Sequence, residues 1–305
     1  MLKGGFKFLY TSYMRIAIYS RGIENDQLKD IALLVKELIK HGAEPVFFQD
    51  FFNQFYSAVD LSGNYSTFNC SEDMDSSIDC LISLGGDGTL LDTVTLVKDS
   101  GIPVLGINYG RLGFLANIGK EEISTAIEAL VERKYALDKR TLLHMDANLP
   151  LFGDVPYALN EFTLHKSDTS SMIKIHTYLN GEFLNTYWAD GLIVSTPTGS
   201  TGYSLSCNGP VVFPDSASFV ITPVAPHNLN IRPIIVPDNT IVSFEVEGRT
   251  DNFLCSLDSR RELVPKEVQI AVRKEDFGIN LIRLNENNFL QTLRNKLSWG
   301  LDKRN

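Results

Sequence analysis

The segment with the strongest chemical character is LGGDGTLL, which spans residues 84–91. An apolar run ends there at two glycines, the carboxylate of Asp87 and a third glycine, Gly88. A strand that leads through glycines into a helix start is typical of a phosphate-binding turn, because backbone N–H groups then point at the anion. A tight turn without a ligand has the same spacing, so the glycines alone leave both interpretations open. The aspartate favours a phosphate-binding turn. A carboxylate there repels phosphate, so its presence indicates a function such as holding a metal or accepting a proton from a hydroxyl.

A second polar block spans residues 189–210, ADGLIVSTPTGSTGYSLSCNGP. Asp190 and Gly191 precede an apolar strand, and a loop rich in hydroxyl groups follows it. Such a loop offers donors and acceptors with little net charge, which suits ribose hydroxyls, amides and phosphate oxygens. An ordinary Ser/Thr/Gly turn explains any single residue here, but the length of the block indicates a polar ligand cleft.

A third candidate is the pair Asn160 and Glu161 in LNEFTLHK. The segment alternates like a strand, so one of the two side chains is expected to face inward, where it needs partners. A strand end with both side chains exposed is the alternative. His227 is interpreted as a loop residue, and Trp188 as a packing residue.

The composition bounds the class of protein. The 305 residues are 44% hydrophobic and 21% charged, which is typical of an ordinary globular protein with room for two domains. The net charge of −9 argues against a nucleic acid or an anionic membrane as partner. No apolar run reaches the roughly 18 residues of a membrane span. The four cysteines form no CxxC pair, so we expect reduced thiols, no zinc site and a cytoplasmic location.

The elements that must position these residues follow two different periodicities. In the first half, apolar strands are expected at 15–20, 45–50, 79–86 and 102–108, and they alternate with helical patterns at 26–42, 51–59, from Thr89 onward and at 121–135. Strands that are apolar on both faces suit a parallel sheet covered by helices on each side. We therefore expect an α/β domain over residues 14–140, preceded by an extension, residues 1–13.

After about residue 140 the helical patterns give way to short, turn-bounded strands, a pattern typical of an antiparallel sandwich or barrel. We expect an all-β, β-sandwich-like domain over residues 141–284. A final helical pattern, NENNFLQTLRNKL, begins at residue 285. We expect residues 285–305 to fold back and complete the first domain.

Together these segments resemble the NAD kinase family. The motifs are GGDGT at 85–89, GRLGFLA at 110–116, NE at 160–161 and DGLIVSTPTGSTGYSLS at 190–206, in the family's order. The resemblance runs from Met14 to the end of the chain. The block at 190–206 is highly specific, whereas GGDGT is shared with lipid kinases and phosphofructokinases.

The resemblance implies a Rossmann-like N-terminal domain and a β-rich C-terminal domain, with the site between them. It also implies ATP-dependent phosphorylation of the 2′-hydroxyl of the adenosine ribose of NAD, which gives NADP. Asp87 would accept the hydroxyl proton and contact NAD, and Gly85, Gly86 and Thr89 would hold phosphates of ATP. The implied NAD-binding residues are Asp87, Gly88, Asn160, Glu161, Asp190, Thr201, Gly202, Tyr203, Ser204, Leu205, Ser206 and Ala225, with Tyr203 packing on a base. The resemblance also suggests a homodimer or homotetramer. A divalent cation, expected to be Mg²⁺, would be carried with ATP, because the sequence shows no dense carboxylate cluster that could form a metal cage.

Three positions depart from the family's pattern. Gly202 stands where alanine is usual, which we expect to be benign. Trp188 stands where a basic residue is common, and Asp258-Ser259-Arg260 stands where DGQ is usual, so the glutamine contact is not carried over.

Three other functions share part of the pattern. A lipid kinase would use GGDGT but would need a basic or amphipathic membrane-facing segment, and a sugar-phosphate kinase would need clustered arginines. A non-catalytic dinucleotide sensor would have no use for Asp87 as a base.

Overall fold

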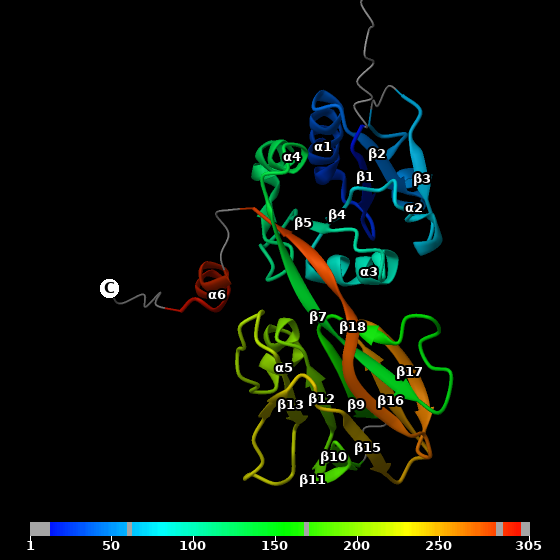
Figure 1. The fold of residues 1–305 in the computed structure, drawn as a ribbon, viewed down its shortest axis with the longest axis vertical. Helices are drawn as coiled ribbons and strands as arrows, with labels where there is room; N and C mark the ends of the chain where they lie inside the picture. Colours follow the sequence, from blue (N-terminus) through cyan, green and yellow to red (C-terminus); the bar gives the residue numbers. More distant parts are fainter. Residues whose placement is uncertain (1–12, 60–62, 168–170, 285–288, 300–305) are drawn as a thin grey trace, which may run out of the picture.

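The computed structural model describes residues 13–59, 63–167, 171–284 and 289–299. Apart from Tyr13, the expected N-terminal extension lies outside these residues. Figure 1 shows an α/β half above a β-rich half, and two long strands run between them.

The α/β half is built on a parallel sheet with the strand order β3-β2-β1-β4-β5. Its strands are β1 (Arg15–Tyr19), β2 (Glu44–Phe48), β3 (Ser66–Phe68), β4 (Cys80–Leu84), β5 (Val104–Asn108) and the short β6 (Ile118–Gly119) beside β5. Its helices are α1 (Leu28–Lys40), α2 (Gln49–Phe55), α3 (Asp87–Val97) and α4 (Ile123–Val131), with 3₁₀ turns η1 (Asn25–Gln27), η2 (Ser71–Asp73) and η3 (Lys120–Glu122). The expected strands and helices of this half are present, and β3 is an additional strand.

Alternation along β1 shows how the sheet is covered on both faces. Ile16 and Ile18 point into a core shared with α1, α2 and α4, whereas Ala17 and Tyr19 point to the opposite face, where α3 packs. The core on the α3 side also contains Leu159 and other residues of the β-rich half. The helix that follows the glycine turn is therefore packed between the two halves of the molecule.

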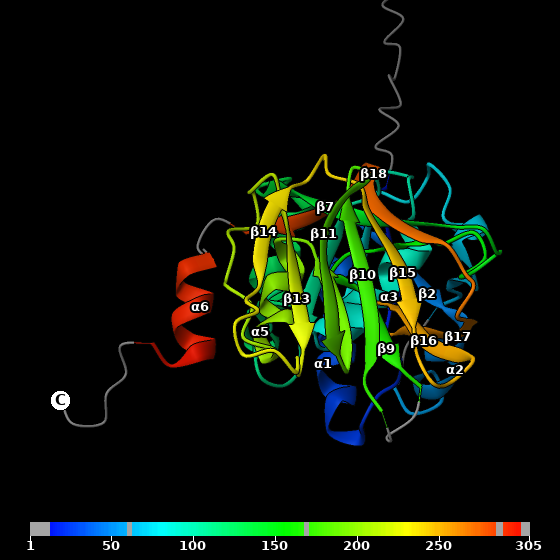
Figure 2. The ribbon, with the colours of Figure 1, turned by 90° about the horizontal axis from the view of Figure 1, so that it is seen from below.

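The β-rich half contains two sheets that enclose one apolar core. The smaller sheet has the order β14-β13-β12-β9-β16-β17. Its strands are β9 (Glu161–Lys166), β12 (Gly191–Ser195), β13 (Ser218–Val224), β14 (Ile234–Pro237), β16 (Asn252–Leu257) and β17 (Arg260–Pro265), and η4 (Thr198–Thr201) and α5 (Tyr203–Ser206) follow β12. The other layer contains β7 (Ala136–Ala147), β8 (Tyr157–Ala158), β10 (Ile173–Leu179), β11 (Glu182–Ala189), β15 (Val242–Glu247) and β18 (Ile270–Arg283). Figure 2 shows this half from below.

The strands β7 and β18 join the two halves. They pair antiparallel along most of their length, and Leu281 of β18 also pairs with Val104 of β5. This makes one continuous 12-stranded sheet. The expected domain boundary near residue 140 falls inside β7.

The last helix, α6 (Phe289–Leu297), lies beside the junction of the two halves. Its Phe289 packs on Phe213 of the β-rich half, with ring centroids 5.3 Å apart. In the part of the chain that the structure describes, no helix is long and apolar enough to span a membrane.

Candidate active site

The glycine turn between β4 and α3 has the shape that a phosphate-binding turn requires. Gly85 has a φ of 146°, which side chains rarely adopt, and a Cβ there would lie 2.5 Å from Oγ1 of Thr89. Gly86 caps α3, and the space around it is open. The first N–H groups of an α-helix have no partner inside the helix, so this space gives an anion access to them.

A cavity of about 160 Å³ opens over this turn. Its lining residues follow the carboxyl ends of β1, β4 and β5, the edge at which open parallel sheets bind ligands. They are Ser20, Arg21, Gly22, Gln27, Leu84, Gly85, Gly86, Thr89, Asn108, Tyr109 and Gly110. All three residues predicted to hold phosphates line the cavity, whose volume suits phosphate groups and not a whole nucleotide.

Asp87, at the first position of α3, is held by the backbone of the GRLGFLA segment. Its Oδ2 accepts the N–H of Phe114 at 2.8 Å, and its Oδ1 accepts those of Leu115 and Ala116 at 3.1 and 2.9 Å. An ionised carboxylate offers about four lone-pair sites, so three N–H groups leave one site, on Oδ2. The arrangement leaves room for a single further donor, such as a hydroxyl.

The loop that holds Asp87 is itself fixed by local hydrogen bonds. The side chain of Asn108 accepts the N–H of Gly110 at 2.8 Å and donates to the carbonyl of Arg111 at 2.9 Å. The N–H of Gly113 donates to the carbonyl of Ala116 at 2.8 Å. A Cβ on Gly113 would overlap the carboxylate of Asp87. Asp87 can therefore take this orientation only because residue 113 is a glycine.

Asn160 and Glu161 lie at the start of β9 beside a second carboxylate that accepts three consecutive backbone N–H groups. Asp258, between β16 and β17, accepts the N–H groups of Leu159, Asn160 and Glu161 at 2.8, 2.8 and 3.1 Å. Within the described residues, Oδ1 of Asn160 and Oε2 of Glu161 are buried without a hydrogen-bond partner. Buried polar atoms without partners are costly, so they mark a place where a ligand can supply the missing bonds.

A cavity of about 350 Å³ adjoins this pair. It is lined by Glu161, Thr163, His165, Tyr203, Leu254, Ser256, Asp258 and Arg261. Burial and the charge of Asp258 raise the pKa of Glu161 to about 8, so Glu161 is predominantly protonated at neutral pH. A protonated carboxyl can donate one hydrogen bond as well as accept others.

The raised pKa of Glu161 predicts a pH-dependent stability. Between about pH 4.5 and pH 8 the unfolded chain loses this proton while the folded chain keeps it, so the free energy of unfolding falls as pH rises, by at most about 1.4 kcal/mol per pH unit. Glu161→Gln removes this contribution, because an amide does not ionise. We expect the variant to gain stability relative to the original chain between pH 5 and pH 8 in urea unfolding.

The matched control for this experiment is Glu182→Gln, at an exposed carboxylate of β11. Its stability is expected to follow that of the original chain at every pH. A constant difference between the Glu161→Gln variant and the original chain from pH 5 to pH 8 would contradict the assignment.

The hydroxyl-rich block after β12 divides into buried and exposed side chains. Ser204 is fully buried, and its Oγ shares a hydrogen bond with Oγ1 of Thr222 at 2.8 Å. Tyr203 and Ser206 are exposed. A Cβ at Gly202 would lie 2.9 Å from Oε2 of Glu161, so glycine leaves extra room beside that carboxyl group. The block therefore contributes both to the scaffold and to the wall of the site.

Asp190 and Ala225 meet where β12 pairs with β13. The N–H of Asp190 bonds to the carbonyl of Val224, and the Asp190 carboxylate forms an ion pair with Lys166 at 2.6 Å. Burial raises the pKa of Tyr203, and its neighbours Cys207, Asp190 and Glu161 raise it further. Tyr203 lines the 350 Å³ cavity together with Glu161.

Trp188 and His227 form an exposed stack beside Asp190. Their ring centroids lie 4.3 Å apart with an interplanar angle of 27°, and the N–H of His227 bonds to the carbonyl of Trp188. The expectations of a loop histidine and a packing tryptophan did not include this pairing.

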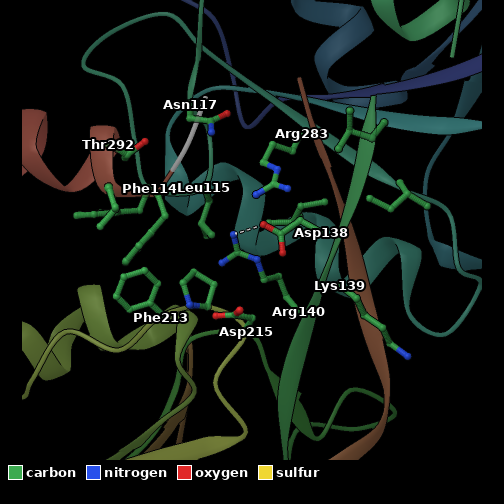
Figure 3. Close-up of a pocket in the computed structure, with 16 residues that line it drawn as sticks. Phe114, Leu115, Asn117, Asp138, Lys139, Arg140, Phe213, Asp215, Arg283 and Thr292 are labelled. Carbon is green, nitrogen blue, oxygen red and sulfur yellow. Dashed lines mark hydrogen bonds and ion pairs between the residues drawn. The ribbon is translucent and has the colours of Figure 1, made fainter. Parts of the chain in front are cut away.

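A larger cavity of about 650 Å³ lies at the junction of the two halves (Figure 3). Phe114 and Leu115 of the loop that binds Asp87 form one wall, and β7, β18, the segment around Phe213 and α6 form the others. Arg140 of β7 points into this cavity, bonding Asp138 at 2.8 Å and Thr198 of η4 at 3.2 Å. Its Nε is buried without a partner among the described residues. Arg140 thereby connects β7 to the hydroxyl-rich block, on the wall of a cavity that Phe114 and Leu115 also line.

Several residues of the site were not predicted. Arg21, Gly113 and Arg140 were not identified, and Asp258 was noted only as part of a departure from the family's pattern. Arg260 belongs to the same Asp258-Ser259-Arg260 segment. It donates to the carbonyls of Val155 and Tyr157 and so helps to hold the segment that precedes Asn160 in place. Arg21 directly follows the predicted strand at 15–20, and a basic residue at that place was a signal that could have identified it.

Comparison with known proteins places the chain among NAD kinases. The family models for the N-terminal and C-terminal domains of ATP-NAD kinase match residues 31–135 and 159–284. The NAD kinases of Cytophaga hutchinsonii and Flavobacterium psychrophilum are each 48% identical, over 96% of this chain and all of theirs.

Solved structures show the same fold. Yeast NADH kinase complexed with NADH gives a TM-score of 0.84 at 23% identity, covering 95% of this chain and 89% of that one. An NAD kinase from Archaeoglobus fulgidus in complex with ATP gives 0.72 at 24% identity, covering 93% and 99%. With the two family models and the two relatives together, this chain belongs to the NAD kinase family.

Proposed function

We propose that this chain transfers the terminal phosphoryl group of ATP to the 2′-hydroxyl of the adenosine ribose of NAD, giving ADP and NADP. The observation that carries the proposal is the position of Asp87. Its carboxylate has one open acceptor site and lies at the start of the helix that borders the phosphate-sized cavity. A base beside a phosphate site is what transfer to a hydroxyl requires.

The phosphates of ATP occupy the cavity over the glycine turn. Gly85 and Gly86 admit the phosphates close to the backbone, and the N–H groups at the start of α3 face them. As the hydroxyl oxygen attacks the terminal phosphorus, its proton passes to Oδ2 of Asp87, and the bond from phosphorus to the leaving oxygen of ADP breaks. The protein contributes chiefly by positioning and by stabilising charge.

NAD lies between Asp87 and the β-rich half. The 2′-hydroxyl is on the carbon next to the one that bears adenine, so a hydroxyl at Asp87 brings the adenine close to Phe114 and Leu115, which line the 650 Å³ cavity. The buried acceptor of Asn160 and the protonated carboxyl of Glu161 suit ribose hydroxyls or an adenine amine. Tyr203 and Asp190 line the path of the rest of the dinucleotide.

A divalent cation, Mg²⁺, accompanies ATP in this proposal. Within the described ranges, no three His, Cys, Asp or Glu side chains lie close enough together to hold a metal ion. Three N–H groups already occupy most of the acceptor capacity of Asp87. The residues therefore fit a cation held by phosphate oxygens and water, which would neutralise phosphate charge.

We also propose a cytoplasmic homodimer or homotetramer. Large apolar side chains are exposed on β11, β14 and the segment between β13 and β14, namely Trp188, Leu229 and Ile235 at 47, 84 and 55%. Such surfaces often mark contacts between chains. Light scattering is expected to give two or four times the mass of one chain, and the monomer mass would contradict this proposal.

The reaction itself is tested by incubating the purified protein with ATP, Mg²⁺ and NAD and separating the products by chromatography. NADP and ADP are expected in equal amounts. Absence of NADP would overturn the kinase assignment, and dinucleotide binding without turnover would favour the sensor alternative. Omitting ATP, and separately omitting NAD, are the controls.

A further inference from the structure

Asp92 of α3 holds the side chain of Arg21, and Tyr19 in turn holds Asp92. Its Nε and Nη2 both donate to the carboxylate of Asp92, with the Nη2–Oδ1 bond at 2.6 Å, and the hydroxyl of Tyr19 donates to Oδ2 of the same carboxylate at 3.1 Å. This paired geometry fixes the plane of the guanidinium. The side chain of Arg21 nevertheless stays half exposed.

The guanidinium lies beside the site of phosphate transfer. Arg21 lines the 160 Å³ cavity together with the glycines of the turn. Its Nη1 lies 3.4 Å from the position that a Cβ of Gly88 would take, one residue from Asp87. A phosphate that enters the cavity therefore comes within reach of this side chain.

Among the described residues that line the cavity, Arg21 is the sole charged one. A triphosphate carries several negative charges, and the other lining groups are backbone, hydroxyl, amide and apolar groups. Guanidinium groups bind phosphate oxygens with paired hydrogen bonds. An exposed ion pair contributes little to folding, so stability alone does not explain why Asp92 and Tyr19 orient Arg21 towards the cavity.

We propose that Arg21 binds the terminal phosphates of ATP, and that Asp92 and Tyr19 are positioning residues for it. This inference rests on the proposed function, since it assigns the phosphate donor to the cavity over the glycine turn.

The inference predicts different effects for the two partners of the ion pair. Arg21→Ala is expected to lower kcat/KM for ATP at least about tenfold, with KM for NAD within about twofold of the original value. Arg21→Lys restores part of the loss, because charge is kept and the paired geometry is not. Asp92→Asn keeps one hydrogen-bond acceptor but turns its amide group towards the other guanidinium N–H, donor to donor. Arg21 then loses its fixed orientation, and kcat/KM for ATP is expected to fall, by less than in Arg21→Ala.

A purely structural ion pair predicts something else. Arg21→Ala and Asp92→Asn would then lower the melting temperature to a similar extent and leave KM for ATP unchanged. The matched control is Arg273→Ala, which removes the arginine of an exposed pair with Asp146 in the β-rich half and is expected to leave KM for ATP unchanged.

Calorimetric titration of the full chain with inorganic tripolyphosphate and Mg²⁺ separates this inference from the kinase assignment. Binding to the original chain, weakened at least about tenfold in Arg21→Ala, supports the role of Arg21 even if no NADP is formed. Equal binding to both proteins, or none to the original chain, overturns it.

Discussion

Replacement of Asp87 by asparagine is expected to lower kcat by about 10²–10⁴-fold while NAD still binds. A ribose hydroxyl is a poor nucleophile, and the open acceptor site on Oδ2 is where its proton can go. Asparagine has nearly the same shape, but its amide nitrogen cannot accept that proton. The measurements are kcat by NADP formation and the Kd of NAD by calorimetry.

The substitution has a structural side effect that the experiment must separate. Asparagine can accept the N–H groups of Leu115 and Ala116, but its amide would face the N–H of Phe114, donor to donor. Loss of a carboxylate at the first turn of α3 also costs about 0.3–1 kcal/mol. A loss of the base is recognised by a low kcat together with a nearly unchanged Kd of NAD, in a variant whose melting temperature falls only slightly. Near-normal kcat would limit Asp87 to a positioning role.

The parts of the fold that follow from local pattern were predictable. Strands such as CLISL are apolar on both faces, so a parallel sheet with helices on each side is the arrangement that buries them. The prediction that α3 would begin at Thr89 was two residues late, because Gly86 is the N-cap and Asp87 already lies in the first turn. The three-residue β3 was missed because so short a segment shows no clear periodicity.

The parts of the site that depend on distant contacts were not predictable from pattern. Asp87 meets its backbone donors 27 to 29 positions later in the chain, and Asp258 meets its donors 97 to 99 positions earlier. Both aspartates are visible in the sequence, but the residues next to them do not indicate that each accepts three consecutive backbone N–H groups. The motif resemblance identified GRLGFLA but did not show what Gly113 does. Gly113 matters because it has no Cβ where Asp87 packs against it, and that contact is known only from the folded structure.

Gly113→Ala is expected to lower kcat by about 10²-fold or more, although the residue that accepts the proton, Asp87, is itself unchanged. The added Cβ would overlap the carboxylate, so either Asp87 leaves its rotamer or the segment of Phe114 to Ala116 moves away. A misplacement of about 1 Å at a reacting group can cost that much. Overpacking costs about 1–3 kcal/mol of stability, so the fold should survive.

The matched control is Leu112→Ala, in the same loop, whose side chain is 42% exposed. It is expected to keep kcat within about twofold, since single exposed side chains usually contribute little. In Gly113→Ala, binding of ATP should be nearly unchanged, because the glycine turn and its cavity are separate from the added methyl group. A Gly113→Ala variant with normal kcat would show that the three N–H groups do not define the reactive position of Asp87. A variant with low kcat that still unfolds cooperatively, above the temperature of the assay, would show that this loop places the base for proton transfer.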